Sequence, residues 1–121
     1  MDPITASLEL VGDPSDAIYA RLFERFPETK ERFDRDVSGS IRAEMLTMVF
    51  DCLMNPAGPY QTGLVRTERV NHDGFGTPAK VFDSLFWIVR DVCRERAGAA
   101  WTPETEAAWT SQIERLLAAS K

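Results

Sequence analysis

The chain has very little of what metal enzymes and nucleotide enzymes usually need. It contains one histidine, His72, and two cysteines, Cys52 and Cys93, which lie far apart in apolar settings. These counts exclude a zinc site built from several His and Cys ligands, and they predict two buried, reduced thiols rather than a disulfide framework. The sequence also has no GxSxG, GxGxxG or GKS/GKT motif. A conventional hydrolase or nucleotide enzyme is therefore not expected.

A basic surplus and long apolar runs are missing too. The chain has 14 Lys and Arg against 19 Asp and Glu, a net charge of −5, so there is no excess of cations to neutralise nucleic-acid phosphates. No stretch approaches the roughly twenty apolar residues of a membrane helix, and the N-terminus lacks the features of a signal peptide. We expect a cytoplasmic protein, with neither nucleic acid nor a membrane among its partners.

What is present is the composition of one globular domain. The chain has 121 residues, of which 44% are hydrophobic and 27% charged. Its length fits one domain, and its composition is close to the globular average. Hydrophobic residues recur at helical spacing almost throughout, and no stretch alternates as a half-buried strand would. We therefore predict a single all-α domain over residues 1–121, with about six helices.

Proline, glycine and capping residues divide the chain into helical segments. We expect an opening segment with Ile4, Leu8 and Val11, and then a helix capped by Ser15 or Asp16 that carries the apolar residues between Ile18 and Phe26. A short charged segment from Glu28 to Arg32 follows, then a helix capped by Ser40 that runs to about Met54, and a helix from about Gln61 to Asn71. A long helix is opened by Thr77 and Pro78 and stopped by Gly98, and a last helix is opened by Thr102 and Pro103.

His72 follows the helix expected from about Gln61 to Asn71 and precedes a glycine-rich corner. Aromatic residues from four segments would converge on it as the walls of an apolar cavity: Tyr19, Phe33, Phe75, Phe82 and Phe86. A haem requires only one axial imidazole and a large apolar slot, because the porphyrin fills four iron positions. The alternative is a half-buried histidine with a solvent or backbone partner, beside phenylalanines that fill an ordinary core.

Three segments, in this order, resemble the bacterial globins from about Asp16 to Leu117. The stretch from Ile18 to Glu28, together with Phe33, is similar to the second globin helix and the phenylalanine that packs on the porphyrin. The sequence His72-Asp73-Gly74-Phe75-Gly76 is similar to the His-x-x-Tyr-Gly pattern around the iron-bound histidine. Trp101-Thr102-Pro103-Glu104 is similar to the start of the final globin helix. Each pattern is weak alone, and their order and spacing carry the resemblance.

The resemblance implies a globin-like fold with haem b (iron protoporphyrin IX) as the cofactor. By this resemblance, His72 would be the proximal iron ligand, Phe33 the ring-packing aromatic and Tyr19 the distal hydroxyl. Ile41 and Met45 fall where the distal helix faces the gas ligand, and Arg42 or Ala43 are alternatives for that place. Phe75, Phe82 and Phe86 would complete the pocket.

The resemblance also suggests roles for charged residues near His72. Arg66, Arg69 and Lys80 are candidates to pair with the haem propionates. Glu68 lies one helical turn before His72, and we expect its carboxylate to be solvated rather than to contact the imidazole. Phe82 stands where flavohaemoglobins carry a tyrosine linked to the proximal histidine, so that interaction is expected to be absent.

The resulting hypothesis is a haem globin that reversibly binds a diatomic gas, oxygen or nitric oxide. A Tyr19 hydroxyl in an apolar pocket would donate a hydrogen bond to the bound gas and slow its release. Nitric-oxide dioxygenation would need an external reductase as a partner. The alternative is a haem-free globin-like regulatory or interaction module, whose pocket would be collapsed or lipid-filled, with Met45, Met48 and Met54 free to repack. A homodimer stays open.

Overall fold

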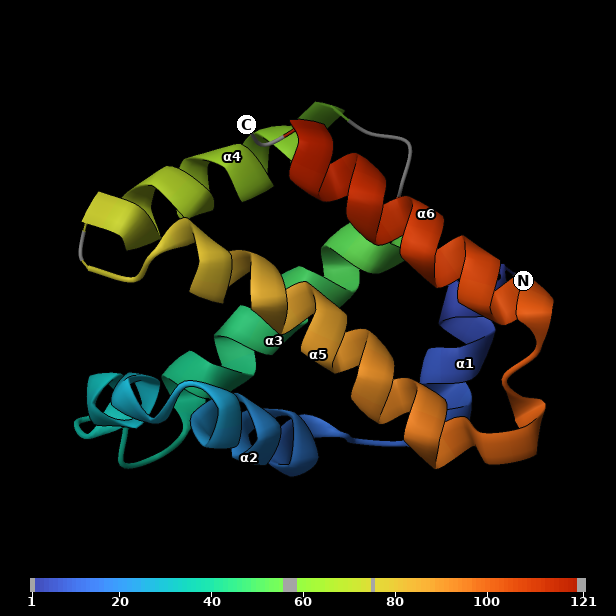
Figure 1. Ribbon diagram of the computed structural model, residues 1–121, viewed down its shortest axis with the longest axis horizontal. Coiled ribbons are helices and arrows are strands. Elements are labelled where there is room, and N and C mark those ends of the chain that lie inside the picture. Colours follow the sequence, from blue (N-terminus) through green and yellow to red (C-terminus); the bar gives the residue numbers. More distant parts are fainter. Residues whose placement is uncertain (1, 56–58, 75, 120–121) are drawn as a thin grey trace.

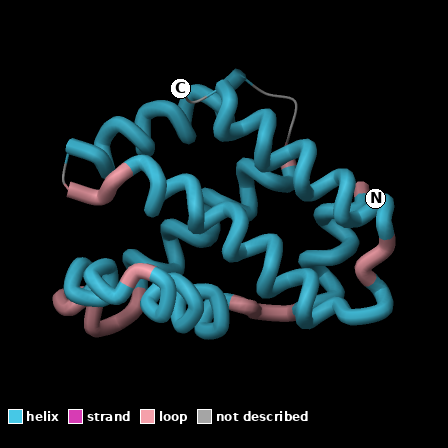
Figure 2. Tube along the Cα trace, in the orientation of Figure 1, coloured by secondary structure: helices cyan, strands magenta, loops and turns pink. Residues whose placement is uncertain are grey.

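The computed structural model describes residues 2–55, 59–74 and 76–119, and turns and helices account for all of them (Figures 1 and 2). Six α-helices and two short 3-10 helices follow one another along these residues. They are α1 (Pro3–Val11), α2 (Ser15–Arg25), η1 (Pro27–Phe33), α3 (Ser40–Met54), α4 (Pro59–Gly74), α5 (Ala79–Ala97), η2 (Gly98–Ala100) and α6 (Pro103–Ala119). The prediction of an all-α fold is confirmed. In the part of the chain that is described, no helix combines the length and the apolar character needed to cross a membrane.

Helix α5 runs through the middle of the molecule and contacts α1, α2, α4 and α6 (Figure 1). Helix α6 packs on α1 and α4, and α3 contacts α1, α4 and α6. Helix η1 packs against α2, which it follows directly in the chain. The end of α4 and the start of α5 therefore lie at one end of the bundle, while α1 and η2 lie at the other (Figure 1).

The core collects apolar side chains from every α-helix, as the helical spacing predicts. The largest side chains with under 2% exposure are Ile18, Leu46, Leu53, Ile88, Val89, Trp109, Ile113 and Leu116. Cys52 and Cys93 are also buried and unpaired, which confirms the prediction of free thiols. Burial raises the pKa of Cys52 to about 11 and the pKa of Cys93 to about 12. Both thiols therefore stay protonated and serve as packing groups.

The predicted start signals are right for α6 and need correction for three other helices. Pro103 is the first residue of α6, and the Thr102 hydroxyl accepts a hydrogen bond from the Thr105 amide at 3.1 Å. Helix α5 begins at Ala79, after Pro78, and has no side-chain cap. For α2, neither Ser15 nor Asp16 is the cap.

The N-cap residues of α2 and α3 are Pro14 and Gly39, which make no side-chain cap bond, and aspartates earlier in the loops accept from the first amides of these helices instead of the predicted residues. The Asp13 carboxylate accepts from the Ser15 amide at 3.0 Å. The Asp36 carboxylate accepts from the Ile41 and Arg42 amides, both at 3.1 Å. Burial alone would raise the pKa of Asp36, but these bonds and the Arg42 guanidinium lower it, so Asp36 is a buried anion at the start of α3.

Helix α4 is longer than predicted, and this changes the setting of His72. It continues from Pro59 to Gly74, so His72 lies inside the last turn rather than after the helix. The chain then reverses at Gly76, which has a φ of +93°, and the Thr77 amide donates to the His72 carbonyl oxygen at 2.7 Å. This backbone hydrogen bond connects the corner between α4 and α5 to His72.

Candidate functional site

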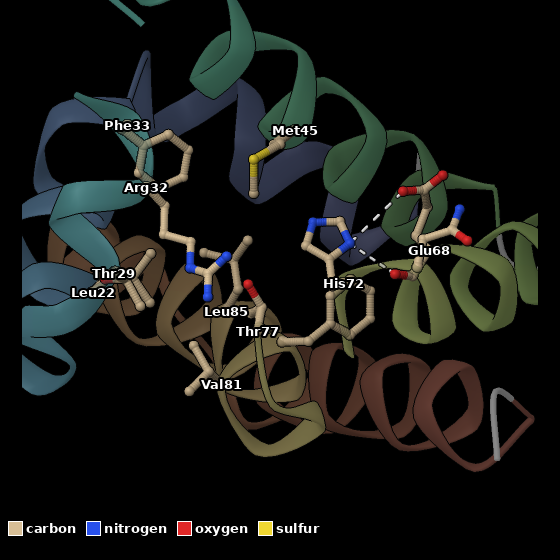
Figure 3. A pocket seen from close by; sticks show the side chains of 12 residues that line it. Leu22, Thr29, Arg32, Phe33, Met45, Glu68, His72, Thr77, Val81 and Leu85 are labelled. Carbon is tan, nitrogen blue, oxygen red and sulfur yellow. Dashed lines mark hydrogen bonds and ion pairs between the residues drawn. The ribbon is translucent and has the colours of Figure 1, made fainter. Parts of the chain in front are cut away.

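His72 lies on the wall of a cavity of about 390 Å³ between η1, α3, the end of α4 and the start of α5 (Figure 3). The wall is mostly apolar, with an arginine and a glutamate among its side chains. The lining residues are Leu22, Thr29, Arg32, Phe33, Met45, Glu68, Asn71, His72, Thr77, Val81, Phe82 and Leu85. A volume of roughly 300–1,000 Å³ with few polar groups is typical of a small-molecule or cofactor pocket.

The orientation of the His72 ring follows from one hydrogen bond. Its Nδ1 atom lies 2.7 Å from the Glu68 carbonyl oxygen, one helical turn earlier. A carbonyl oxygen only accepts, so Nδ1 carries the hydrogen and, in the neutral ring, Nε2 carries the lone pair. Figure 3 shows the other ring nitrogen turned toward the interior of the cavity. The chain thus presents an imidazole lone pair to an apolar space.

The Glu68 side chain also approaches His72, which differs from the expected solvated carboxylate. Its Oε2 atom lies 3.8 Å from Nδ1, and the two side chains are 32% and 28% exposed. The i, i+4 spacing on α4 brings them together. Glu68 therefore orients His72 through the hydrogen bond to its carbonyl oxygen, and its carboxylate lies nearby without a hydrogen bond of its own.

Three of the predicted aromatic and distal residues meet His72 at the cavity: Phe33, Met45 and Phe82. The Phe82 ring centroid is 5.1 Å from that of His72, with an interplanar angle of 48°. Phe86 contacts Phe82, with ring centroids 6.0 Å apart, and lines a smaller adjoining cavity of about 70 Å³ that Met45, His72 and Phe82 also line. Phe75 lies outside the described residues.

The Tyr19 hydroxyl does not face this cavity, contrary to the sequence prediction. It donates to the Arg42 carbonyl oxygen at 2.9 Å, and the cavity wall does not include Tyr19. The Tyr19 ring packs beside Phe33, with centroids 5.6 Å apart. Burial raises the pKa of Tyr19, so it stays a neutral hydrogen-bond donor. The acceptor it finds on α3 is the physical reason for the difference.

Of the four residues considered for the distal place, Met45 is the one that lines the cavity. Ile41 is 54% exposed and does not line the cavity. The Arg42 guanidinium is held by Asp36, with Nε 3.0 Å from Oδ2, and Ala43 is exposed. Of these four, only Met45 points into the space in front of His72 (Figure 3).

The three basic residues proposed for propionates do not line the cavity. Arg66 donates to the Ala119 carbonyl oxygen at 3.0 Å, and Arg69 pairs with Asp83 at 3.0 Å. Lys80 is exposed on α5. Among the described residues, the basic side chain on the cavity wall is Arg32, which the sequence reading did not single out. Because Arg32 directly precedes Phe33 in the sequence, a pocket at Phe33 could have indicated that Arg32 lies near it.

The donor set restricts which metals the chain can hold. Within the described ranges, no group of three or more His, Cys, Asp or Glu side chains comes together. A bare metal ion would therefore find fewer than three side-chain ligands among these residues, too few for a stable site. A metal that brings its remaining ligands with it, inside an apolar organic ring, fits the lone imidazole and the aromatic walls.

Comparisons with protein-family models, with curated proteins and with solved structures find no match for this chain. Its function is therefore argued from the cavity and its side chains.

Proposed function

We propose that this protein is a haem-binding globin that reversibly binds a diatomic gas. The observation that carries the proposal is the His72 hydrogen bond to the Glu68 carbonyl oxygen, which leaves the Nε2 lone pair for the cavity. A fixed tautomer and ring orientation are what an axial metal ligand requires, because the second ring nitrogen sets both. A haem, when bound, would supply an iron with one coordination position open to a gas.

The walls of the cavity support a flat apolar cofactor. Phe33 approaches from η1, Phe82 from α5 and Met45 from α3, so aromatic and thioether surfaces come from three sides. These groups exclude water and contact a macrocycle through dispersion and sulfur–aromatic interactions. An open space of about 390 Å³ counts against a haem-free regulatory module with a collapsed pocket, and the lone-pair nitrogen of His72 at its wall favours a haem over a lipid as the occupant.

Absorption spectroscopy of the purified protein titrated with haem tests the proposal. We expect saturation at one haem per chain, the spectrum of an imidazole-ligated iron, and a further shift when the reduced sample is exposed to carbon monoxide. His72→Gly should lose the imidazole signature and recover it when free imidazole is added. Asp73→Ala, which changes an exposed neighbour outside the cavity wall, is the matched control and should behave as the wild type.

Two results would contradict the proposal. One is the absence of saturable haem binding by the wild type. The other is a His72→Gly spectrum that matches the wild type without imidazole, which would mean that another group binds the iron.

A further inference from the structure

The cavity contains a nucleophile as well as space for a ligand. His72 is the single histidine of the chain, and the hydrogen bond from its Nδ1 atom to the Glu68 carbonyl oxygen leaves a lone pair on Nε2. That nitrogen faces the apolar interior (Figure 3). An imidazole with an available lone pair attacks acyl groups itself, so acyl transfer at His72 requires neither a serine nor a GxSxG motif.

Two polar groups face the same interior from other parts of the wall. Arg32 from η1 and Thr77 from the corner before α5 line the cavity, and Figure 3 shows both side chains extending toward its interior. The Arg32 guanidinium keeps its positive charge while it donates to the Gly76 carbonyl oxygen at 2.7 Å, and the Thr77 hydroxyl is a further donor. A positive charge and a hydroxyl donor in an apolar space stabilise the oxyanion that forms when a carbonyl group is attacked.

The Glu68 carboxylate favours the charge that the imidazole gains in such a reaction. Its Oε2 atom lies 3.8 Å from Nδ1 of His72. An imidazole acylated on Nε2 while Nδ1 keeps its hydrogen is a cation, and a negative charge at this distance lowers its free energy. The oxyanion and the imidazolium thus each have a partner of opposite charge on the cavity wall, Arg32 for the first and Glu68 for the second.

An apolar recess for an acyl chain lies beside His72. The smaller cavity of about 70 Å³ shares Met45, His72 and Phe82 with the larger one, and apart from His72 and Glu68 its lining residues are apolar or thiol side chains. Each methylene group that moves from water into such a space strengthens binding roughly fourfold. The recess therefore favours an acyl group longer than acetyl.

We propose that the haem-free protein hydrolyses short-chain apolar esters of phenols, with His72 as the nucleophile. Nε2 attacks the ester carbonyl carbon, and the phenolate leaves with the electron pair of the C–O bond. The acyl group is then bonded to Nε2, while Nδ1 keeps its hydrogen. Water adds to the same carbon, the carboxylic acid leaves, Nε2 regains its lone pair, and one proton goes to solvent. The reaction consumes only ester and water, and it does not rest on the proposed function.

Two p-nitrophenyl esters, the acetate and the butyrate, test the proposal on the full chain purified without haem. Release of p-nitrophenolate is followed by absorbance. We expect kcat/KM for the butyrate to be about tenfold that for the acetate, whereas free imidazole should show no such preference. His72→Ala should lower kcat/KM for the butyrate at least about tenfold, because the nucleophile is lost. Asp73→Ala, which changes an exposed neighbour outside the cavity wall, should leave both values unchanged.

Two further variants keep His72 in place and test its surroundings. Met45→Trp, whose larger side chain enters both cavities, should bring kcat/KM for the butyrate down to that for the acetate or below. Thr77→Val keeps the shape of the side chain and removes the hydroxyl donor, so kcat should fall at least about threefold while KM changes less than about twofold. Hydrolysis that survives His72→Ala, or a wild type with no preference for the butyrate, would overturn the proposal.

The outcomes separate this inference from the proposed function. Haem added to the wild type should suppress hydrolysis, because Nε2 is then coordinated and the space is filled. Ester hydrolysis that depends on His72, without any imidazole-ligated haem spectrum, would support this inference and contradict the globin function. An imidazole-ligated spectrum without such hydrolysis would do the reverse.

Discussion

The two halves of α5 lie in very different surroundings although both are apolar. In the second half, Ile88, Val89 and Cys93 are 0% exposed and pack within the core. In the first half, Val81, Phe82 and Leu85 line the cavity that contains His72. Side chains that face a void have lost the dispersion contacts a neighbour would supply. Val81 and Leu85 are also buried, so both halves belong to the core, but the first half has fewer packing partners on the side that faces the cavity.

The largest effect is expected where the core is most tightly packed. Trp109 is 0% exposed, and its indole nitrogen donates to the Ser7 hydroxyl at 2.9 Å. Trp109→Ala should lower the free energy of unfolding by about 3–5 kcal/mol, through the cavity it leaves and the loss of the indole hydrogen bond, while the Ser7 hydroxyl keeps its own bond to the Ile4 carbonyl oxygen. Urea denaturation followed by circular dichroism measures this value.

Trp87→Ala is the matched control for that substitution. Trp87 is only half-buried on α5, where the Arg90 guanidinium carbon lies 4.8 Å from its ring centroid. Its loss should destabilise the protein clearly less than Trp109→Ala. Equal losses would show that full burial and the bond to Ser7 add nothing to the cost of removing a tryptophan.

Ligand binding in the cavity at the start of α5 should raise the free energy of unfolding. If haem fills the cavity, a free ligand concentration 100 times the dissociation constant should add about 2.7 kcal/mol to the free energy of unfolding. Thermal denaturation with and without haem detects this as a higher Tm. An unchanged Tm at high haem concentration would mean that the folded chain does not bind haem in preference to the unfolded chain.

Met45→Trp tests whether a haem-dependent rise in Tm comes from binding in the cavity, because the larger side chain occupies part of that space. The side chain lines both cavities, so a larger one has space to enter without the usual cost of overpacking. The ligand-free variant should be about as stable as the wild type, and haem should no longer raise its Tm. A haem-dependent rise that survives the substitution would place the ligand elsewhere.

The same contrast explains which features could be read from the sequence. The helices of the core have regular apolar spacing between proline and glycine signals, and these predict α5 with nearly its observed bounds and α6 with its observed start. The order of Phe33, Met45, His72 and Phe82 along the chain also pointed to residues that the fold brings to one cavity. Those predictions depend on periodicity, which is a local property.

What the sequence missed depends on contacts between distant residues or on side-chain direction. Arg32 reaches Gly76 across 44 positions, and no local pattern marks such a pair. Helical spacing put Tyr19 on an inward edge, but its hydroxyl follows the acceptor it finds, the Arg42 carbonyl oxygen. The cap of α3 is similar, because several polar side chains precede that helix and only the folded loop selects Asp36.

Tyr19→Phe should have a moderate effect on stability and a small one on gas release. Loss of the hydrogen bond to Arg42 should cost about 0.5–1.5 kcal/mol in the free energy of unfolding. With the hydroxyl held outside the cavity wall, oxygen release from the haem-loaded protein should change less than about threefold, or about 0.6 kcal/mol. Stopped-flow measurement checks the rate. A much faster release would mean that the hydroxyl turns into the cavity when a ligand is bound.

His72→Ala should change the stability of the ligand-free protein least of all, by about 0.5 kcal/mol or less. The variant loses the bond to the Glu68 carbonyl oxygen and the contact with Phe82, but His72 is 28% exposed in the last turn of α4 and alanine is the better helix former. These contributions oppose each other, so urea denaturation of the ligand-free variant should overlay that of the wild type. In the presence of haem the two should differ, because only the wild type supplies an imidazole. A ligand-free variant that is several kcal/mol less stable would instead identify His72 as a structural residue of the core, and the difference between the two halves of α5 would no longer separate folding from binding.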